Sequence, residues 1–199
     1  MKSNRCFQYS LAIIFLFGSH LLYSQETNLR SEFDFSEIDF ANDTSVALTG
    51  QWEFYWDTLL EPDESSLKYS LEYLPGFWKN YGVNEYSATG YATFKTRVKL
   101  SRERPILAFQ IGDIHNSYNL FVNEKLVRSV GHVAKSIDGS VPKWVPQFVV
   151  LDDTSEILEI TLQVSNFRHR NGGVQHAIVL GNVDYLLSVK ESVSLADLL

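Results

Sequence analysis

An alternation of apolar and polar residues is the feature that most restricts how this chain can fold. In segment 46–56 the rings of Trp52, Phe54 and Trp56 occupy every second position, which places them on one face of a β-strand. The sequence predicts about eight short strands with almost no helical period between them: 46–56, 89–100, 105–111, two arms within 115–131, 145–151, 157–164 and 177–180. Strands at this spacing are typical of an antiparallel β-sandwich or barrel.

The segment His115–Gly131 predicts a β-hairpin beside a binding surface. Its two apolar runs are separated at Asn123, and asparagine tolerates the left-handed conformation that a tight turn requires. His115 and Asn116 lie where the chain enters the hairpin, and the loop that follows it contains Trp144. Polar and aromatic loops on a rigid β-framework are where ligands usually bind.

Residues 1–24 have the pattern of a secretion signal. Lys2 and Arg5 precede the unbroken apolar run Leu11–Phe17, and Ser24 is a small residue at a suitable cleavage point. The apolar run is short for a membrane span, although an uncleaved anchor is the alternative. The single cysteine lies inside this leader, so the mature chain would contain none. We therefore expect a periplasmic or extracellular protein of a bacterial envelope rather than a disulfide-bonded animal ectodomain.

The expected organisation has two further parts after the signal peptide. Residues 25–182 contain all the predicted strands and would form the sandwich domain. In residues 183–199, apolar side chains recur at three- and four-residue steps, which is the pattern of an amphipathic helix. We expect this tail to lead into an apolar region of a longer protein, such as a membrane segment.

The charge of the chain argues against two classes of partner. The formal net charge is −7, and removal of Lys2 and Arg5 with the leader lowers it to −9. A net-acidic domain without a run of basic residues is poorly suited to nucleic acids and to anionic membrane surfaces. We expect neither as a partner.

No motif in the sequence indicates catalysis. Glycoside hydrolysis needs two carboxylates across a cleft, whereas Glu53 is a lone candidate, and an isolated acid on a sheet is usually solvated or hydrogen-bonded. The histidines are too dispersed for a zinc site, and no nucleophile or phosphate-binding motif is present. A structural calcium near Asp113 or residues 152–153 would leave no sequence signature. We expect no enzymatic activity and no cofactor other than such a calcium.

Segment 165–173 follows a predicted strand and ends in two glycines, and it concentrates side chains that could hold a ligand: Arg168, His169, Arg170 and Asn171. Planar donors such as arginine and asparagine suit sugar hydroxyls, carboxylates or phosphates. The alternative is that both arginines pair with acidic neighbours. Trp78 and Trp144 also have two interpretations, because a tryptophan can stack on a sugar or fill the end of a sandwich.

Five segments resemble a known family in the same order along the chain: Leu48–Trp56, Leu74–Trp78, Gly90–Phe94, Phe121–Val127 and Val164–Phe167. They are similar to the sugar-binding jelly roll of family-two glycoside hydrolases, which has the galactose-binding-like fold. They resemble more closely the periplasmic jelly-roll domain of bacterial seven-transmembrane receptors with diverse intracellular signalling modules. The resemblance covers roughly residues 30–182 and implies an all-β, antiparallel jelly-roll β-sandwich, to which the tail pattern adds a short C-terminal helix.

The resemblance also implies a function in ligand sensing. We expect an extracytoplasmic domain that binds a carbohydrate or a related small molecule and acts with a membrane-embedded signalling region of a longer parent chain. The alternatives are a non-catalytic carbohydrate-binding domain of a glycoside hydrolase and a structural module for protein interaction. Loops from different strands meet at one end of a jelly roll, so we expect the ligand at such a shared end: His115, Asn116, Trp144, Arg168, His169, Arg170 and Asn171.

Overall fold

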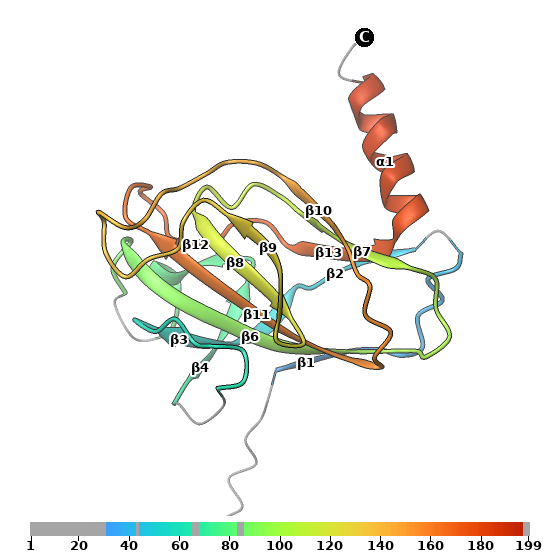
Figure 1. Ribbon diagram of the computed structural model, residues 1–199, viewed down its shortest axis with the longest axis horizontal. Helices are drawn as coiled ribbons and strands as arrows, with labels where there is room; N and C mark the ends of the chain where they lie inside the picture. Colours follow the sequence, from blue (N-terminus) through green and yellow to red (C-terminus); the bar gives the residue numbers. More distant parts are fainter. Residues whose placement is uncertain (1–30, 43, 65–67, 83–85, 197–199) are drawn as a thin grey trace, which may run out of the picture.

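The computed structural model describes residues 31–42, 44–64, 68–82 and 86–196, in which two β-sheets pack face to face (Figure 1). The larger sheet contains β1 (Glu32–Phe35), β3 (Gly50–Trp56), β4 (Ser70–Leu74), β6 (Gly90–Leu100), β8 (Ser117–Val122), β9 (Lys125–Val130) and β11 (Ile157–Asn166). The smaller sheet contains β2 (Ser45–Ala47), β7 (Leu107–Ile111), β10 (Gln147–Val150) and β13 (Ile178–Asn182). Two short strands, β5 (Gly76–Phe77) and β12 (Gly173–Val174), pair with each other, and η1 (Trp78–Asn80) follows β5. The predicted antiparallel jelly-roll sandwich with a short C-terminal helix is confirmed.

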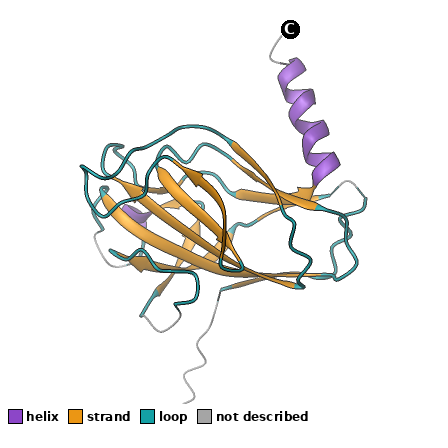
Figure 2. Ribbon diagram, in the orientation of Figure 1, coloured by secondary structure: helices purple, strands orange, loops and turns teal. Residues whose placement is uncertain are grey.

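The strands are drawn in orange in Figure 2, and their order places β6 at the centre of the larger sheet. That order is β4-β3-β6-β11-β8-β9, and the order in the smaller sheet is β10-β7-β13-β2. The first part of β6 pairs with β3, whereas its last residues pair with β1, which runs parallel to it. Outward-facing side chains of β6 therefore lie in the middle of the outer face of the larger sheet.

The core lies between the sheets and is built from alternate residues of their strands. Trp52, Phe54 and Phe94 are buried from the larger sheet, and Phe109 and Leu180 from the smaller one. Phe54 lies opposite Phe94 in the β3–β6 register, with ring centroids 5.0 Å apart. Burial of one such side chain typically contributes about 1.5–3 kcal/mol to folding. The predicted core face of segment 46–56 is confirmed.

The predicted hairpin is present as β8 and β9. Its two-residue turn consists of Asn123 and Glu124, whose φ angles are +46° and +68°. The side chain of Asn123 accepts a hydrogen bond from the Glu159 N–H and donates one to Asp153, both at 2.7 Å. A turn with two positive φ angles matches the twist of the flanking strands, which is why the chain keeps Glu124 in a conformation that favours glycine.

Segment 46–56 differs from the prediction because it forms two strands in different sheets. After β2 ends at Ala47, the buried Leu48 donates its N–H to the Ile178 carbonyl, and β3 begins at Gly50. A Cβ at position 50 would lie 2.9 Å from the ring of Phe33 in β1, so glycine allows that ring to pack closely on the start of β3. The sequence patterns also did not predict β4, β5 or β12.

Helix α1 (Val183–Ala196) follows β13 directly and projects away from the sandwich (Figure 1). The side chain of Asn182 accepts a hydrogen bond from the Asp184 N–H at 2.9 Å, which satisfies a donor of the first turn. Leu186 is buried at the start of the helix, whereas Leu187 is exposed. No helix in the described part of the chain has both the length and the apolar character to span a bilayer. The predicted signal peptide, residues 1–24, lies outside the described residues.

Candidate functional site

Three loops meet at the end of the sandwich that lies opposite α1 in Figure 1. The indole Nε1 of Trp144 donates to the His115 carbonyl at 3.0 Å, and the two rings meet edge to face with centroids 5.7 Å apart. The imidazole of His115 stacks on that of His169, with centroids 5.3 Å apart and planes 14° from parallel. The structure therefore brings together rings from the loops before β8, after β9 and after β11. We call this group the loop-end cluster: His115, Trp144, Arg168, His169, Arg170 and Asn171.

The two tryptophans with open assignments have different environments. Trp78 is completely buried, and its indole donates to the Ala88 carbonyl at 3.1 Å, so it fills the end of the sandwich. Trp144 is 60% exposed although its N–H is hydrogen-bonded. Trp144 thus presents an indole face to solvent in a fixed orientation.

The position of His115 is set by Asp113. A carboxylate oxygen of Asp113 accepts the His115 backbone N–H at 2.9 Å, which closes a short side-chain turn. His115 itself has a φ of +57°, an uncommon conformation for a residue with a side chain. The turn places the imidazole between Trp144 and His169.

Asn166 organises the turn that carries the arginines. Its buried side chain accepts hydrogen bonds from the backbone N–H groups of Arg168 and His169 and donates to the carbonyls of Ala88 and His169. Gly172 then packs directly on the indole of Trp78, where a Cβ would lie 2.0 Å from the ring. Asn166 was not among the predicted site residues, although it holds the predicted ones in place.

The two guanidinium groups of this turn are available to a ligand. Arg168 and Arg170 are exposed, and neither side chain forms an ion pair or a hydrogen bond with any described residue. Asn171 accepts a hydrogen bond from Lys79 Nζ at 2.7 Å. The alternative in which both arginines pair with acidic neighbours is therefore not what the structure shows.

Asn116, the seventh predicted residue, lies beneath the cluster rather than on its surface. It is completely buried and donates to the Gly173 carbonyl at 2.9 Å, which ties the entrance of the hairpin to β12. Tyr118 is buried below it, and burial raises the pKa of its hydroxyl above the usual range, so that the group stays protonated. Asn116 therefore supports the loops from below.

The carboxylates considered for calcium already have protein partners. Asp113 accepts the His115 N–H, Asp152 forms an ion pair with Lys125 at 2.6 Å, and Asp153 accepts hydrogen bonds from its own turn. Within residues 31–42, 44–64, 68–82 and 86–196, no three His, Cys, Asp or Glu side chains are grouped so that they could hold a metal ion.

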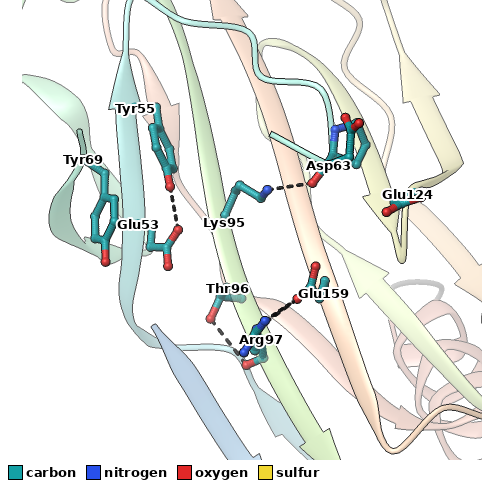
Figure 3. A pocket seen from close by; sticks show the side chains of 10 residues that line it. Glu53, Tyr55, Asp63, Tyr69, Lys95, Thr96, Arg97, Glu124 and Glu159 are labelled. Carbon is teal, nitrogen blue, oxygen red and sulfur yellow. Dashed lines mark hydrogen bonds and ion pairs between the residues drawn. The ribbon is translucent and has the colours of Figure 1, made fainter. Parts of the chain in front are cut away.

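Apart from the loop-end cluster, a pocket lies on the outer face of the larger sheet (Figure 3). It has a volume of about 260 Å³ and we call it the outer-face pocket; it is lined by Glu53, Tyr55, Pro62, Asp63, Tyr69, Lys95, Thr96, Arg97, Glu124 and Glu159. In the sequence, Glu53 and Lys95 lie on the polar faces of their predicted strands. This alternation is the only feature of the sequence that points to the outer-face pocket. The pattern does not show which loop crosses the face and encloses it.

Comparisons with known proteins identify the fold. No family model and no curated protein matches the chain. Among solved structures, the chain is similar to a β-glucuronidase from Faecalibacterium prausnitzii, with 10% identity and a TM-score of 0.54 over 69% of this chain and 31% of that one. A β-glucuronidase from an uncultured Clostridium species gives 10% identity and a TM-score of 0.54 over 69% and 28%. A glycosyl hydrolase family 2 member from Bacteroides cellulosilyticus gives 13% identity and a TM-score of 0.53 over 69% and 20%.

At these identities the likeness concerns the fold alone. The chain spans less than a third of the length of each of these enzymes. The implied relationship to a jelly roll of family-two glycoside hydrolases is confirmed at the level of fold, whereas the relationship to membrane receptors stays a prediction.

Proposed function

We propose that this chain is an exported, non-catalytic domain that binds a saccharide or a related hydroxylated molecule at the loop-end cluster. The observation that carries the proposal is the exposed indole of Trp144 beside the stacked rings of His115 and His169. Small-molecule sites combine apolar and aromatic surface with a few well-placed polar groups. Here the ring of a sugar would stack on Trp144, and its hydroxyls would accept hydrogen bonds from Arg168 and Arg170.

Ligand sensing for a membrane protein is the role we favour for this binding. The leader-like residues 1–24 support export, and helix α1 directly after the last strand supports a connection to a further region. In such a receptor, a ligand bound at the loop-end cluster would change the conformation of the sandwich, and helix α1 would transmit that change to the membrane-embedded region.

The second candidate is an accessory carbohydrate-binding domain of a glycoside hydrolase. The fold likeness to portions of three such enzymes favours it, and a span of 20–31% of those chains is compatible with a part that carries no catalytic residues. The sequence that follows residue 199 in the parent protein separates the two candidates, because a receptor requires hydrophobic spans and a hydrolase requires a catalytic domain.

The binding proposal is tested by a glycan screen followed by titration of variants. Thermal shift identifies a saccharide, and calorimetry then compares the parent with Trp144→Ala and Arg170→Ala. Loss of one donor or one stacking surface should cost about 1–3 kcal/mol, or roughly 5- to 150-fold in affinity. Tyr73→Ala is the control, because Tyr73 is an exposed ring on β4 outside the cluster. Unchanged affinity in both folded cluster variants would contradict the proposal.

Export is tested separately by mass. If residues 1–24 are a cleaved signal, envelope-localised protein should begin at or near Gln25. An intact mass that still includes Met1 would contradict cleavage and favour an uncleaved anchor.

A further inference from the structure

Residues 57–64, which follow β3, cross the outer face of the larger sheet, and Pro62 and Asp63 line the outer-face pocket. Leu60 is completely buried there. Its N–H donates to Thr93 Oγ1 at 3.0 Å, and its carbonyl accepts from Gln163 Nε2 at 2.8 Å. Farther along, Lys95 Nζ donates to the carbonyl of Pro62 at 2.7 Å. Residues 60–62 are thus bonded to β6 and β11, which holds this wall of the pocket in place.

Two carboxylates are held on opposite sides of β6 in this pocket (Figure 3). Glu53 is only 8% exposed; its Oε2 accepts the Tyr55 hydroxyl at 2.7 Å, whereas its Oε1 has no hydrogen-bond partner among the described residues. Glu159 Oε1 accepts from Nε and Nη2 of Arg97 at 3.0 and 2.6 Å. Glu53 lines the pocket, and its second carboxylate oxygen can accept a hydrogen bond from a hydroxyl group of a ligand.

Aromatic rings stand beside the first of these carboxylates. Tyr55 and Tyr69 both line the pocket, and their ring centroids lie 5.5 Å apart with planes inclined at 50°. Tyr55 is almost completely buried, and Tyr69 is half-buried at the rim. The pocket therefore offers an aromatic ring for apolar contact next to acceptors for hydroxyl groups.

The charge of the pocket differs in sign from that of the loop end. Among the described residues that line it, four carboxylates face two cations, and each cation is already bonded to protein oxygens: Glu53, Asp63, Glu124 and Glu159, with Lys95 and Arg97. The loop end instead carries Lys79, Arg168 and Arg170. An anionic group is therefore disfavoured in the outer-face pocket, because it would face uncompensated carboxylates at short range.

We infer that the outer-face pocket is a second binding site, for a saccharide unit without negative charge. Hydroxyl groups of the unit donate to Glu53 and Glu159, and its ring packs on Tyr69. The volume of about 260 Å³ lies below the range of about 300–1,000 Å³ typical of drug-sized ligands, which fits a small unit of this kind. This inference goes beyond the proposed function and does not depend on it, because the two sites share no residue.

The test is a titration of the full chain followed by two-dimensional NMR of its backbone amides. The uncharged probes are cellohexaose, xylohexaose and mannohexaose, and trigalacturonate is the anionic probe. At least one uncharged probe should shift the amide signals of Glu53, Lys95 and Arg97, and trigalacturonate should not. Glu53→Gln should weaken this binding roughly five- to tenfold, since a neutral amide oxygen is a weaker hydrogen-bond acceptor than a carboxylate. Tyr69→Ala should weaken it as well, whereas Trp144→Ala should not.

Several results would overturn the inference. Absence of shifts at these amides with all three uncharged probes at millimolar concentration is one, and equal shifts with trigalacturonate are another. If Glu53→Gln lowers the melting temperature, the rim variant Tyr69→Ala decides, with the exposed Tyr73→Ala as its matched control. Shifts near Trp144 and Arg170 report on the loop-end cluster separately, so failure of one site is distinguishable from failure of the other.

Discussion

Truncation of Trp52 to alanine should destabilise the sandwich more than most single substitutions. Trp52 is 0% exposed, its ring meets that of Phe33 edge to face at 6.2 Å, and its indole N–H points at the Leu48 carbonyl at 3.4 Å. Removal of a buried tryptophan ring typically costs about 3–5 kcal/mol. For a domain of about 150–250 residues, each kcal/mol lowers the melting temperature by about 2–4 °C. We therefore expect Trp52→Ala to melt roughly 6–20 °C below the parent.

The assay is calorimetric or circular-dichroism melting of the parent and two variants. Trp144→Ala is the matched control, because the same ring is removed from a position that is 60% exposed. It should lose no more than about 1 kcal/mol, mainly through its hydrogen bond to His115. If Trp52→Ala melts within one or two degrees of the control, the assignment of the core face is wrong. Reducing agent should change none of these melting temperatures, since Cys6 is the single cysteine of the chain.

Two further substitutions test local features of the sheet. Glu124→Gly should stabilise the protein by about 0.5–1 kcal/mol in urea unfolding, because φ at this position is +68°. The control is Glu156→Gly, at an exposed position without positive φ, which should not stabilise the protein. Equal effects of the two substitutions would contradict the turn assignment. Hydrogen bonds from Ser36 and then Lys99 lower the pKa of Asp34 from 3.8 to about 2. The stabilising effect of the Asp34 carboxylate is therefore complete above pH 3.8 and lost as the pH falls through about 2. The Asp34→Asn variant should melt below the parent at about pH 6, and its melting temperature should approach that of the parent at about pH 2. A difference in melting temperature that does not change with pH would contradict this linkage.

The strands were predictable because a buried face imposes a period of two on the sequence. Burial of the same face excludes registers shifted by one residue, and the structure places Phe54 opposite Phe94. The break after Ala47 was not predictable, because apolar residues continue through a point where the chain changes sheets. The structure shows that Leu48 still pairs with the smaller sheet through Ile178, whereas Gly50 lies in the larger sheet.

The residues of the loop-end cluster could be selected by composition, but their contacts could not. His115, Trp144 and His169 lie far apart in sequence, and their ring contacts depend on which strands are neighbours. The outer-face pocket was even harder to predict from the sequence. Glu53 looked like an isolated acid, because its neighbours come from the β3–β6 register and from a loop whose buried Leu60 has no strand pattern.

The central claim, that the loop end binds the saccharide, is tested most directly by acrylamide quenching of tryptophan fluorescence. Trp144 is 60% exposed, whereas Trp52 and Trp78 are completely buried and Trp56 is partly buried, so Trp144 should account for most of the quenching. A saturating amount of the saccharide found by thermal shift should reduce the quenching to that of the Trp144→Phe variant. If calorimetry shows the saccharide bound while quenching of the parent stays unchanged, the ligand does not cover Trp144 and the claim is contradicted.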